Sequence, residues 1–209
     1  MSFSSQDQPN HPVLKGDGTG VYRIRVIGNC GSGKSTLAAE LSELLHLPLI
    51  KLDQIHWKPN CSWENFTDEE FEAELWRQVK EHKKTGWVMD GNYRKHTRKV
   101  TEELVTDLVW LDLPFPLYFF RLFIRTMRRL LYLDPPTQVG CREEWVMTFA
   151  SKDSIFLEAI TKHDAVRKHW KPLMEEDLAN NKRNWIKISG WGSQLRRWME
   201  SVKELARGR

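Results

Sequence analysis

The chain has 209 residues, of which 40% are hydrophobic and 29% charged, and its formal net charge is +4. This is ordinary globular composition, and the length is enough to bury a sizeable core. No apolar run approaches the roughly 18 residues that a membrane-spanning helix needs, and the N-terminus lacks an apolar signal core. We therefore expect a cytoplasmic protein that neither spans a membrane nor is secreted.

Three cysteines, Cys30, Cys61 and Cys141, are an odd number and are widely spaced. This spacing argues against a disulfide framework and for a reducing compartment. No C-x-x-C or paired Cys/His spacing occurs, so a zinc site is not expected. The mild positive charge is compatible with anionic small ligands and with non-specific nucleic-acid binding.

The first 20 residues are polar and end in a glycine-rich cluster, which predicts a mobile extension over 1–20 before a single domain over 21–209. Residues 21–27 are rich in β-branched and apolar types and predict a strand. Leucines at helical spacing follow from Leu37 to Leu45.

Between this strand and helix lies a phosphate-binding loop that fits the pattern G-x-x-x-x-G-K-S/T at every fixed position. Its glycines allow main-chain N–H groups to approach phosphate oxygens, and the helix N-terminus adds partial positive charge. Lys34 can reach the β- and γ-phosphates, and the Ser35 hydroxyl can bind magnesium. The predicted cofactors are ATP and Mg²⁺. The predicted nucleotide-binding residues are Gly28, Asn29, Cys30, Gly31, Ser32, Gly33, Lys34, Ser35 and Thr36.

The next predicted strand, 47–52, ends at Asp53, where α/β sheets place residues that face ligands. Asp53 is either a ligand for an acceptor hydroxyl or amine, or a helix or loop cap. Trp57, in a predicted loop over 54–66, either stacks on a base or forms a buried wall. A helix is predicted to begin at Thr67, which forms a capping box with Glu70.

A third strand is predicted over 87–90 and a fourth over 108–112. The basic segment after the third strand, up to Lys99, reads either as the start of a helix or as an exposed loop. Near 116–131 a helix is predicted on which four arginines share an arc of roughly 100°. Those arginines are Arg121, Arg125, Arg128 and Arg129, and the adjoining apolar side, expected to pack, carries Leu117, Phe120, Ile124, Met127, Leu130 and Leu131. From the pattern alone, the arginine face is as readily a solvated basic surface as a functional one.

A short lid is expected at about 132–154, followed by a helical region over 154–180 in which Pro172 begins a new helix or introduces a kink. A fifth strand is predicted over 184–188 and a closing helix over 194–206. Five strands alternating with helices predict a parallel sheet covered on both faces, which is a three-layer α/β/α fold of the P-loop NTPase type.

These residues resemble the adenylate-kinase-like phosphotransferases. More closely, the chain looks like the small P-loop proteins described as DNA-topology-modulation or adenylate-kinase-related proteins. The resemblance covers roughly residues 21 to 200 and rests on the phosphate loop, Leu52-Asp53 with Trp57, Asp90-Gly-Asn-Tyr93, Trp110-Leu-Asp-Leu-Pro114 followed by arginines, and Gly140-Cys141.

Adenylate kinases carry an Asp-Gly-Phe-Pro-Arg segment that Asp90, Gly91 and Arg94 match at the same spacing. The resemblance implies that Asp90 orients magnesium-bound water and that Arg94 holds the phosphate of the acceptor. The same family has an Asp-x-Pro turn followed by two lid-base arginines, which implies that Arg121 and Arg125 stabilise charge on the transferred phosphoryl group. Candidates for a further lid arginine are Arg142 and Arg167.

The sequence therefore predicts an ATP- and Mg²⁺-dependent kinase of a nucleotide or small metabolite, as a monomer or homodimer. Its predicted catalytic residues are Lys34, Asp90, Arg121 and Arg125; its predicted acceptor residues are Asp53, Trp57, Asp90, Gly91 and Arg94; its predicted metal ligands are Ser35 and Asp90. The alternatives are a regulatory P-loop NTPase associated with nucleic acid, and a nucleotide-binding protein that has lost turnover. No groove-reading motif occurs, which disfavours sequence-specific DNA recognition.

Overall fold

A computed structural model of the chain describes residues 13–57, 65–134, 155–161 and 163–208. Its elements in chain order are β1 (Arg23–Gly28), α1 (Lys34–Leu45), β2 (Leu49–Lys51), α2 (Leu52–His56), α3 (Asp68–Glu81), β3 (Trp87–Asp90), α4 (Arg94–Glu103), β4 (Asp107–Asp112), α5 (Phe115–Leu130), α7 (Ile155–Thr161), α8 (His163–Ala179), β5 (Asn184–Ser189) and α9 (Ser193–Arg207).

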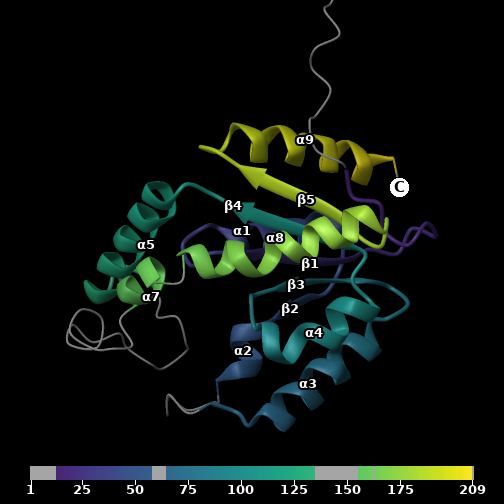
Figure 1. The fold of residues 1–209 in the computed structure, drawn as a ribbon, viewed down its shortest axis with the longest axis horizontal. Coiled ribbons are helices and arrows are strands. Elements are labelled where there is room, and N and C mark those ends of the chain that lie inside the picture. The colour runs from purple at the N-terminus through teal and green to yellow at the C-terminus, as the bar shows by residue number, and fades with distance from the viewer. Residues whose placement is uncertain (1–12, 58–64, 135–154, 162, 209) are drawn as a thin grey trace, which may run out of the picture.

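The strands form one parallel sheet in the order β2-β3-β1-β4-β5, with β1 at its centre (Figure 1). Val26 of β1 pairs in register with Asp90 of β3, and Gly28 pairs with Leu111 of β4. The loops after β1 and β3 therefore leave the sheet side by side. Parallel strands need crossover helices, which cover the sheet on both faces. The predicted three-layer α/β/α fold with a five-stranded parallel sheet is confirmed.

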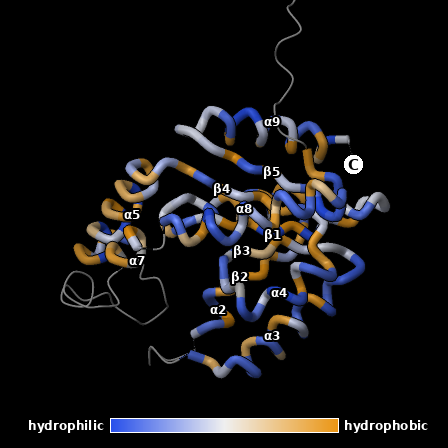
Figure 2. The backbone as a smooth tube through the Cα atoms, in the orientation of Figure 1, coloured by the Kyte–Doolittle hydropathy of each residue, from blue (hydrophilic) through white to orange (hydrophobic). Residues whose placement is uncertain are grey.

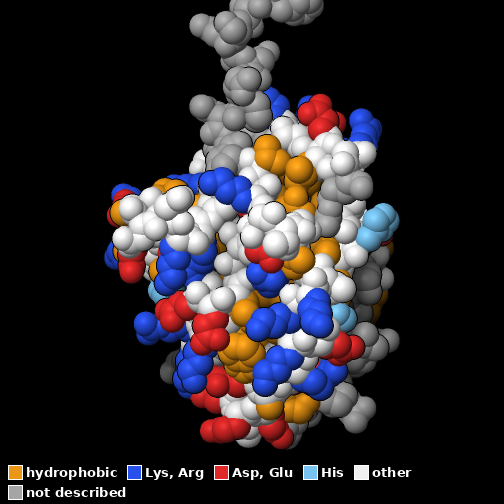
Figure 3. Space-filling model, turned by 90° about the vertical axis from the view of Figure 1, so that its right-hand side faces the viewer, with side chains coloured by type: hydrophobic (Ala, Val, Ile, Leu, Met, Phe, Trp, Pro, Cys, Tyr) orange, Lys and Arg blue, Asp and Glu red, His pale blue; other side chains and the backbone are white. Residues whose placement is uncertain are grey.

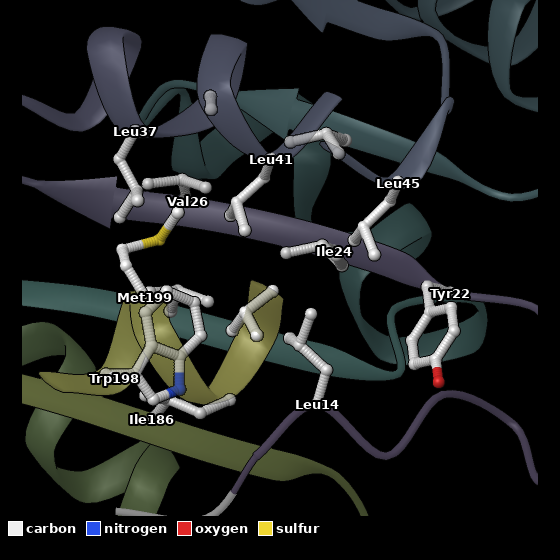
Figure 4. Packing of buried hydrophobic residues seen from close by; sticks show 14 of the residues in the cluster. Leu14, Tyr22, Ile24, Val26, Leu37, Leu41, Leu45, Ile186, Trp198 and Met199 are labelled. Atoms are coloured by element: carbon white, nitrogen blue, oxygen red, sulfur yellow. The ribbon is translucent and has the colours of Figure 1, made fainter. Parts of the chain in front are cut away.

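One apolar core lies between the sheet and the helices α1 and α9 (Figure 4). Leu37 and Leu41 of α1 face Ile24 and Val26 of β1 there, and Trp198 of α9 closes the other side. The spacing of four residues between the two leucines places them on one helix face. The leucine stripe predicted after the phosphate loop is therefore the packed face of α1.

The second core lies on the other face of the sheet, under α3, α4 and α8. Trp110 and Trp185 contact edge to face with ring centroids 6.5 Å apart, and Trp170 of α8 lies 6.2 Å from Trp185. The largest buried side chains include Trp87, Trp110, Trp170 and Trp198. These four tryptophans are core residues, and none is available as a stacking platform for bases.

Residues 13–20, expected to belong to a mobile extension, are packed against the domain instead. Leu14 is only 5% exposed and belongs to the first core. The carboxylate of the buried Asp107 accepts hydrogen bonds from the main-chain N–H groups of Lys15 and Gly16, at 2.8 and 3.0 Å. Packing against the domain thus extends N-terminal to the predicted boundary, and residues 1–12 are outside the described part.

The segment after β2 also differs from the prediction. A short helix, α2, replaces the first part of the expected loop over 54–66 and contains Asp53 in its first turn. The capping box predicted at Thr67 is present, and the predicted stripe of Phe71, Leu75 and Val79 is buried. The basic segment after β3 is helical from Arg94, which settles the choice between helix and loop.

The packed face of α5 was predicted only in part, since Leu130 is buried and Leu117 packs against a core cluster, but most of the face lies elsewhere. Its buried residues are Tyr118, Leu122, Thr126 and Leu130, spaced by four. Phe120 is 62% exposed, and Ile124 and Leu131 are exposed as well. The apolar side of α5 is wider than its buried face, since Phe120, Phe123 and Ile124 are exposed, so hydrophobicity alone did not identify the buried side. Much of α5 is coloured as hydrophobic in Figure 2.

In the C-terminal half, Pro172 lies inside α8 and does not begin a new helix. Most of the predicted lid, together with Cys61, Cys141 and Arg142, lies outside the described residues.

We predict that Asp107→Ala destabilises the protein by about 2–4 kcal/mol, because it leaves several buried donors without an acceptor. Besides Lys15 and Gly16, those donors include the side-chain amide of Asn184, at 2.7 Å, and the hydroxyl of Thr106, at 2.7 Å. Urea unfolding measures the effect, with Glu40→Ala, an exposed carboxylate on α1, as the control. Equal unfolding midpoints for the two variants would show that Asp107 does not anchor the N-terminal segment.

Candidate functional site

The phosphate loop packs very closely against its neighbours at the carboxyl end of β1. A Cβ atom on Gly31 would lie 2.5 Å from the carbonyl oxygen of Tyr118 in α5, and one on Gly28 would lie 2.8 Å from that of Leu111 in β4. Neither distance leaves room for a side chain. The two glycines therefore fix the loop between β4 and α5.

The N-terminus of α1 is open toward an anion. Gly33, with φ 90°, is its N-cap, no side chain caps it, and its first turn contains no acidic residue. The first N–H groups of a helix have no partner within the helix, and together with the helix dipole they favour a phosphate. Lys34, half-buried, begins this turn. No side-chain cap or acidic side chain at this turn would therefore compete with an anion.

Asp90, at the end of β3, is the second element of the site. It is 6% exposed, and the Ser35 hydroxyl donates a hydrogen bond to its carboxylate. Burial raises the pKa of Asp90, the Ser35 hydrogen bond and Lys34 oppose this rise, and the neighbouring Asp53 adds to it. Among the described residues, Oδ1 of Asp90 has no hydrogen-bond partner.

This arrangement fits a magnesium ion. A hydroxyl and a carboxylate are oxygen ligands that Mg²⁺ prefers, and the unpartnered carboxylate oxygen would gain a cation. The described part of the chain contains no group of three or more His, Cys, Asp and Glu side chains able to hold a metal. Mg²⁺ commonly takes one or two protein ligands and completes its shell with phosphate oxygens and water. Ser35 and Asp90 would be those ligands.

Asn92, which was not among the predicted site residues, is hydrogen-bonded to the phosphate loop. Its side-chain amide donates to the carbonyl of Gly28 at 2.8 Å and accepts from the N–H of Gly28 at 3.3 Å. The Arg25 guanidinium in turn donates to the main-chain carbonyl of Asn92 at 2.8 Å. A charged residue inside an otherwise apolar central strand was the sequence signal that could have drawn attention to this link.

Asp53, Trp57 and Gly91 lie around a polar and aromatic corner formed by α2 and the turn after β3. The Tyr93 hydroxyl donates to the Asp53 carboxylate at 2.8 Å. The His56 ring lies 4.8 Å from both the Trp57 and Tyr93 rings, and burial lowers the pKa of His56. Trp57 is half-buried, and Arg94 is placed by its main chain at the start of α4. Sequence reasoning missed His56 and Tyr93.

The four arginines of α5 have different surroundings. The Arg125 guanidinium donates to the Sγ atom of Cys30 in the phosphate loop at 3.4 Å, and its Nε is buried without a partner among the described residues. Arg128 forms a two-fold hydrogen-bonded pair with Asp134, with both hydrogen bonds at 2.8 Å. Arg121 is exposed. Of these, the structure brings Arg125 to the loop.

Asp112, at the end of β4, contacts two cationic side chains, Arg167 and Lys187. Its Oδ1 accepts from Arg167 of α8 at 2.7 Å, and its Oδ2 lies 3.0 Å from the Lys187 ammonium. Nearby, the Tyr118 hydroxyl lies 2.7 Å from Nδ1 of His163, and burial raises the pKa of Tyr118 to about 12. Arg167, a candidate lid arginine from sequence, is thus committed to Asp112 in this structure.

A scan against protein-family models finds no match, and a search of curated proteins finds none either. Among solved structures, the chain is similar to an unliganded sugar kinase from Janibacter sp. HTCC2649, with a TM-score of 0.52 and 17% identity over 88% of this chain and 94% of that one. It is also similar to a gluconokinase from Sinorhizobium meliloti 1021, with a TM-score of 0.50 and 16% identity over 89% and 92%. At these identities the likeness shows the fold alone, a parallel sheet covered by helices on both faces.

No helix within the described residues is both long and apolar enough to cross a membrane.

We predict that Asp90→Asn stabilises the ligand-free protein at neutral pH. The pKa of Asp90 is raised by burial, so the ionised carboxylate costs folding energy, and this cost grows as the pH rises from the ordinary aspartate pKa through the raised value. The melting temperature should rise by about 2–4 °C, which is about 1 kcal/mol for a chain of this size. The gain should vanish at pH values below the ordinary aspartate pKa.

Thermal unfolding across that pH range measures the effect, with Glu40→Gln, at an exposed carboxylate on α1, as the matched control. A stabilisation by Asp90→Asn that is the same at acidic and neutral pH would contradict a raised pKa for the Asp90 carboxyl group.

Proposed function

We propose that the protein is an ATP- and Mg²⁺-dependent phosphotransferase that acts on a small metabolite or nucleotide. The observation that carries the proposal is the pairing of Ser35 with a buried, incompletely satisfied Asp90 directly beside the open N-terminus of α1. Phosphate oxygens suit the helix end, and a divalent cation suits the carboxylate. Few ligands other than a magnesium nucleotide satisfy both at once.

In this proposal the loop N–H groups and Lys34 hold the β- and γ-phosphates. Bound Mg²⁺ would neutralise developing charge on the transferring group. Ser35 and Asp90 fix its position, and Arg125, already at the loop, stabilises the same charge from α5. Arg121, one turn earlier, stays a predicted partner of Arg125.

The acceptor is proposed to bind at the corner formed by α2 and the turn after β3. Asp53 offers a carboxylate that already accepts a hydroxyl hydrogen bond from Tyr93, so it can equally accept one from a substrate hydroxyl. Trp57 and His56 supply ring surfaces beside it. The structural neighbours are a sugar kinase and a gluconokinase, which favours a small hydroxylated metabolite over a nucleotide. The role of Arg94 in holding an acceptor phosphate stays a prediction.

An acceptor screen with radiolabelled γ-phosphate tests the proposal. It covers sugars, small hydroxy acids, nucleosides and nucleoside monophosphates, with Mg²⁺ and with chelator, and uses Asp90→Asn as the enzyme control. We expect Mg²⁺-dependent transfer to a hydroxylated small metabolite that Asp90→Asn abolishes. Nucleotide binding without transfer to any acceptor would instead favour a protein that has lost turnover.

We predict that Arg125→Ala lowers kcat about a hundredfold or more, since charge-stabilising arginines act mainly in the transition state. Arg125→Lys should not restore the rate, because lysine lacks the planar fork that engages two oxygens. Arg128→Ala is the matched control, because the Arg128 side chain pairs with Asp134. Since that pair is not expected to contact the transferred group, the substitution should change kcat by only about threefold. Steady-state kinetics on the identified acceptor measures all three.

Equal kcat values for Arg125→Ala and Arg128→Ala would mean that the arginine face of α5 is merely solvated.

The closer likeness to DNA-topology-modulation proteins stays a prediction with a separate test. Any nucleic-acid binding should be weak, salt-sensitive and tolerant of sequence, because it would rest on phosphate contacts alone. Binding to random and defined duplexes at several salt concentrations measures this. A thousandfold preference for one sequence at physiological salt would favour the nucleic-acid function.

A further inference from the structure

A polar cavity lies between α4 and α8, on the face of the sheet opposite α1 and α9. Its volume is about 370 Å³, and its lining residues are Arg25, Arg98, Thr101, Glu102, His169, Trp170, Leu173, Glu176, Lys182 and Arg183. None of these residues belongs to the phosphate loop, to the Ser35–Asp90 pair or to the acceptor corner. The cavity is therefore a separate feature of the molecule.

Arg25 is the group in this cavity that most needs explanation. It projects from the central strand β1 and is 1% exposed. It donates to the Thr101 hydroxyl and to the carbonyls of Gly91 and Asn92, and it stacks over the Trp170 ring at 5.1 Å. These partners are all neutral.

No described carboxylate pairs with Arg25, and its Nε atom is buried without a hydrogen-bond partner among the described residues. Burial, together with the nearby charge of Arg183, lowers the pKa of Arg25 to about 9. A buried charge without a counter-ion is costly, and proteins usually supply one. The buried Arg25 guanidinium thus lacks a negatively charged partner among the described residues, and an anion in the cavity would supply one.

The neighbouring charged side chains do not act as a counter-ion for Arg25. Arg183 is held by a two-fold hydrogen bond to Asp177, at 2.6 and 2.7 Å. Arg98 is paired with Glu102 at 2.8 Å. Lys182 is exposed, follows the last turn of α8, and acts electrostatically on Glu102. Its ammonium adds a further cation to a cavity wall that also carries the carboxylates of Glu102 and Glu176.

We propose that this cavity binds a small organic oxyanion, a phosphorylated or carboxylated metabolite, through Arg25 and Lys182. Some terminal N–H groups of Arg25 already donate to Thr101, Gly91 and Asn92, so a remaining one would bind an oxygen of the anion, and the Lys182 ammonium would add a point charge. The volume lies at the small end of the range of ligand pockets, about 300–1,000 Å³, which suits a metabolite rather than a nucleoside triphosphate. Thr101 and His169 supply further polar groups, and Trp170 and Leu173 supply an apolar wall.

The position of the cavity in the fold agrees with a small ligand that enters from solvent. In Figure 1, α4 and α8 both lie in front of the sheet. α8 meets α5 at its N-terminal end, where His163 contacts Tyr118, whereas the cavity is lined by α8 residues from His169 onward. Figure 3, the view from the right of Figure 1 and so from the side away from α5, shows Lys and Arg side chains mixed with acidic ones around apolar atoms.

Calorimetric titration with inorganic phosphate, and in a second arm with citrate, tests the proposal. The decisive variant is Lys182→Glu, whose exposed position leaves folding intact. The matched control is Lys203→Glu on α9, which makes the same change in net charge on the opposite layer, where Lys203 pairs only with Glu200 among the described carboxylates. We expect Lys182→Glu to weaken binding about tenfold and Lys203→Glu to change it less than about twofold. The arm that binds more tightly identifies phosphate or carboxylate as the anion class.

Tryptophan fluorescence provides a second measurement at the cavity itself. Phosphate should change the emission of the wild-type protein and of Lys203→Glu, and Trp170→Phe should remove most of that change. Equal affinities of Lys182→Glu and Lys203→Glu would overturn the proposal, because phosphate bound only at the phosphate loop would respond to both substitutions alike. A wild-type protein that binds neither anion would overturn it as well.

Discussion

The structure depends on how the end of the central strand is held. Gly28 packs against β4, where no side chain fits, and the amide of Asn92 pairs with both main-chain polar groups of Gly28. Asn92 is in turn held by the guanidinium of Arg25, which comes from the same strand. The phosphate loop and the turn after β3 are therefore one hydrogen-bonded unit, and Asp90 and Ser35 are brought together by it.

Electrostatics explains why this unit is suited to a charged ligand. The open N-terminus of α1 and Lys34 favour an anion, whereas the buried Asp90 favours a cation a short distance away. Neither demand is fully met by the protein itself, since burial raises the pKa of Asp90 and leaves one of its oxygens without a partner in the described structure. A magnesium nucleotide carries both kinds of charge in the required order. The same reasoning, applied to the buried Arg25, leads to the second anion site.

The sequence predicted the features that depend on short-range pattern. The phosphate loop, the capping box at Thr67 and the five parallel strands follow from residue type and spacing, and all are present. Features that depend on partners distant in sequence were missed or wrong. The buried side of α5 is set by its contact with Gly31, 87 residues before Tyr118 along the chain, and the Asn92–Gly28 pair joins residues 64 apart. Neither leaves a periodic signal in the sequence.

The most direct test of the account is calorimetric titration of ATP, with and without Mg²⁺, onto the wild-type protein and Lys34→Ala. The account predicts that the wild-type protein binds ATP, that Mg²⁺ tightens this binding, and that Lys34→Ala weakens it strongly, because the loop then holds the phosphates without their principal cation. Equal ATP affinities for the two proteins, or an affinity unaffected by Mg²⁺, would contradict the assignment of the loop and of the Ser35–Asp90 pair.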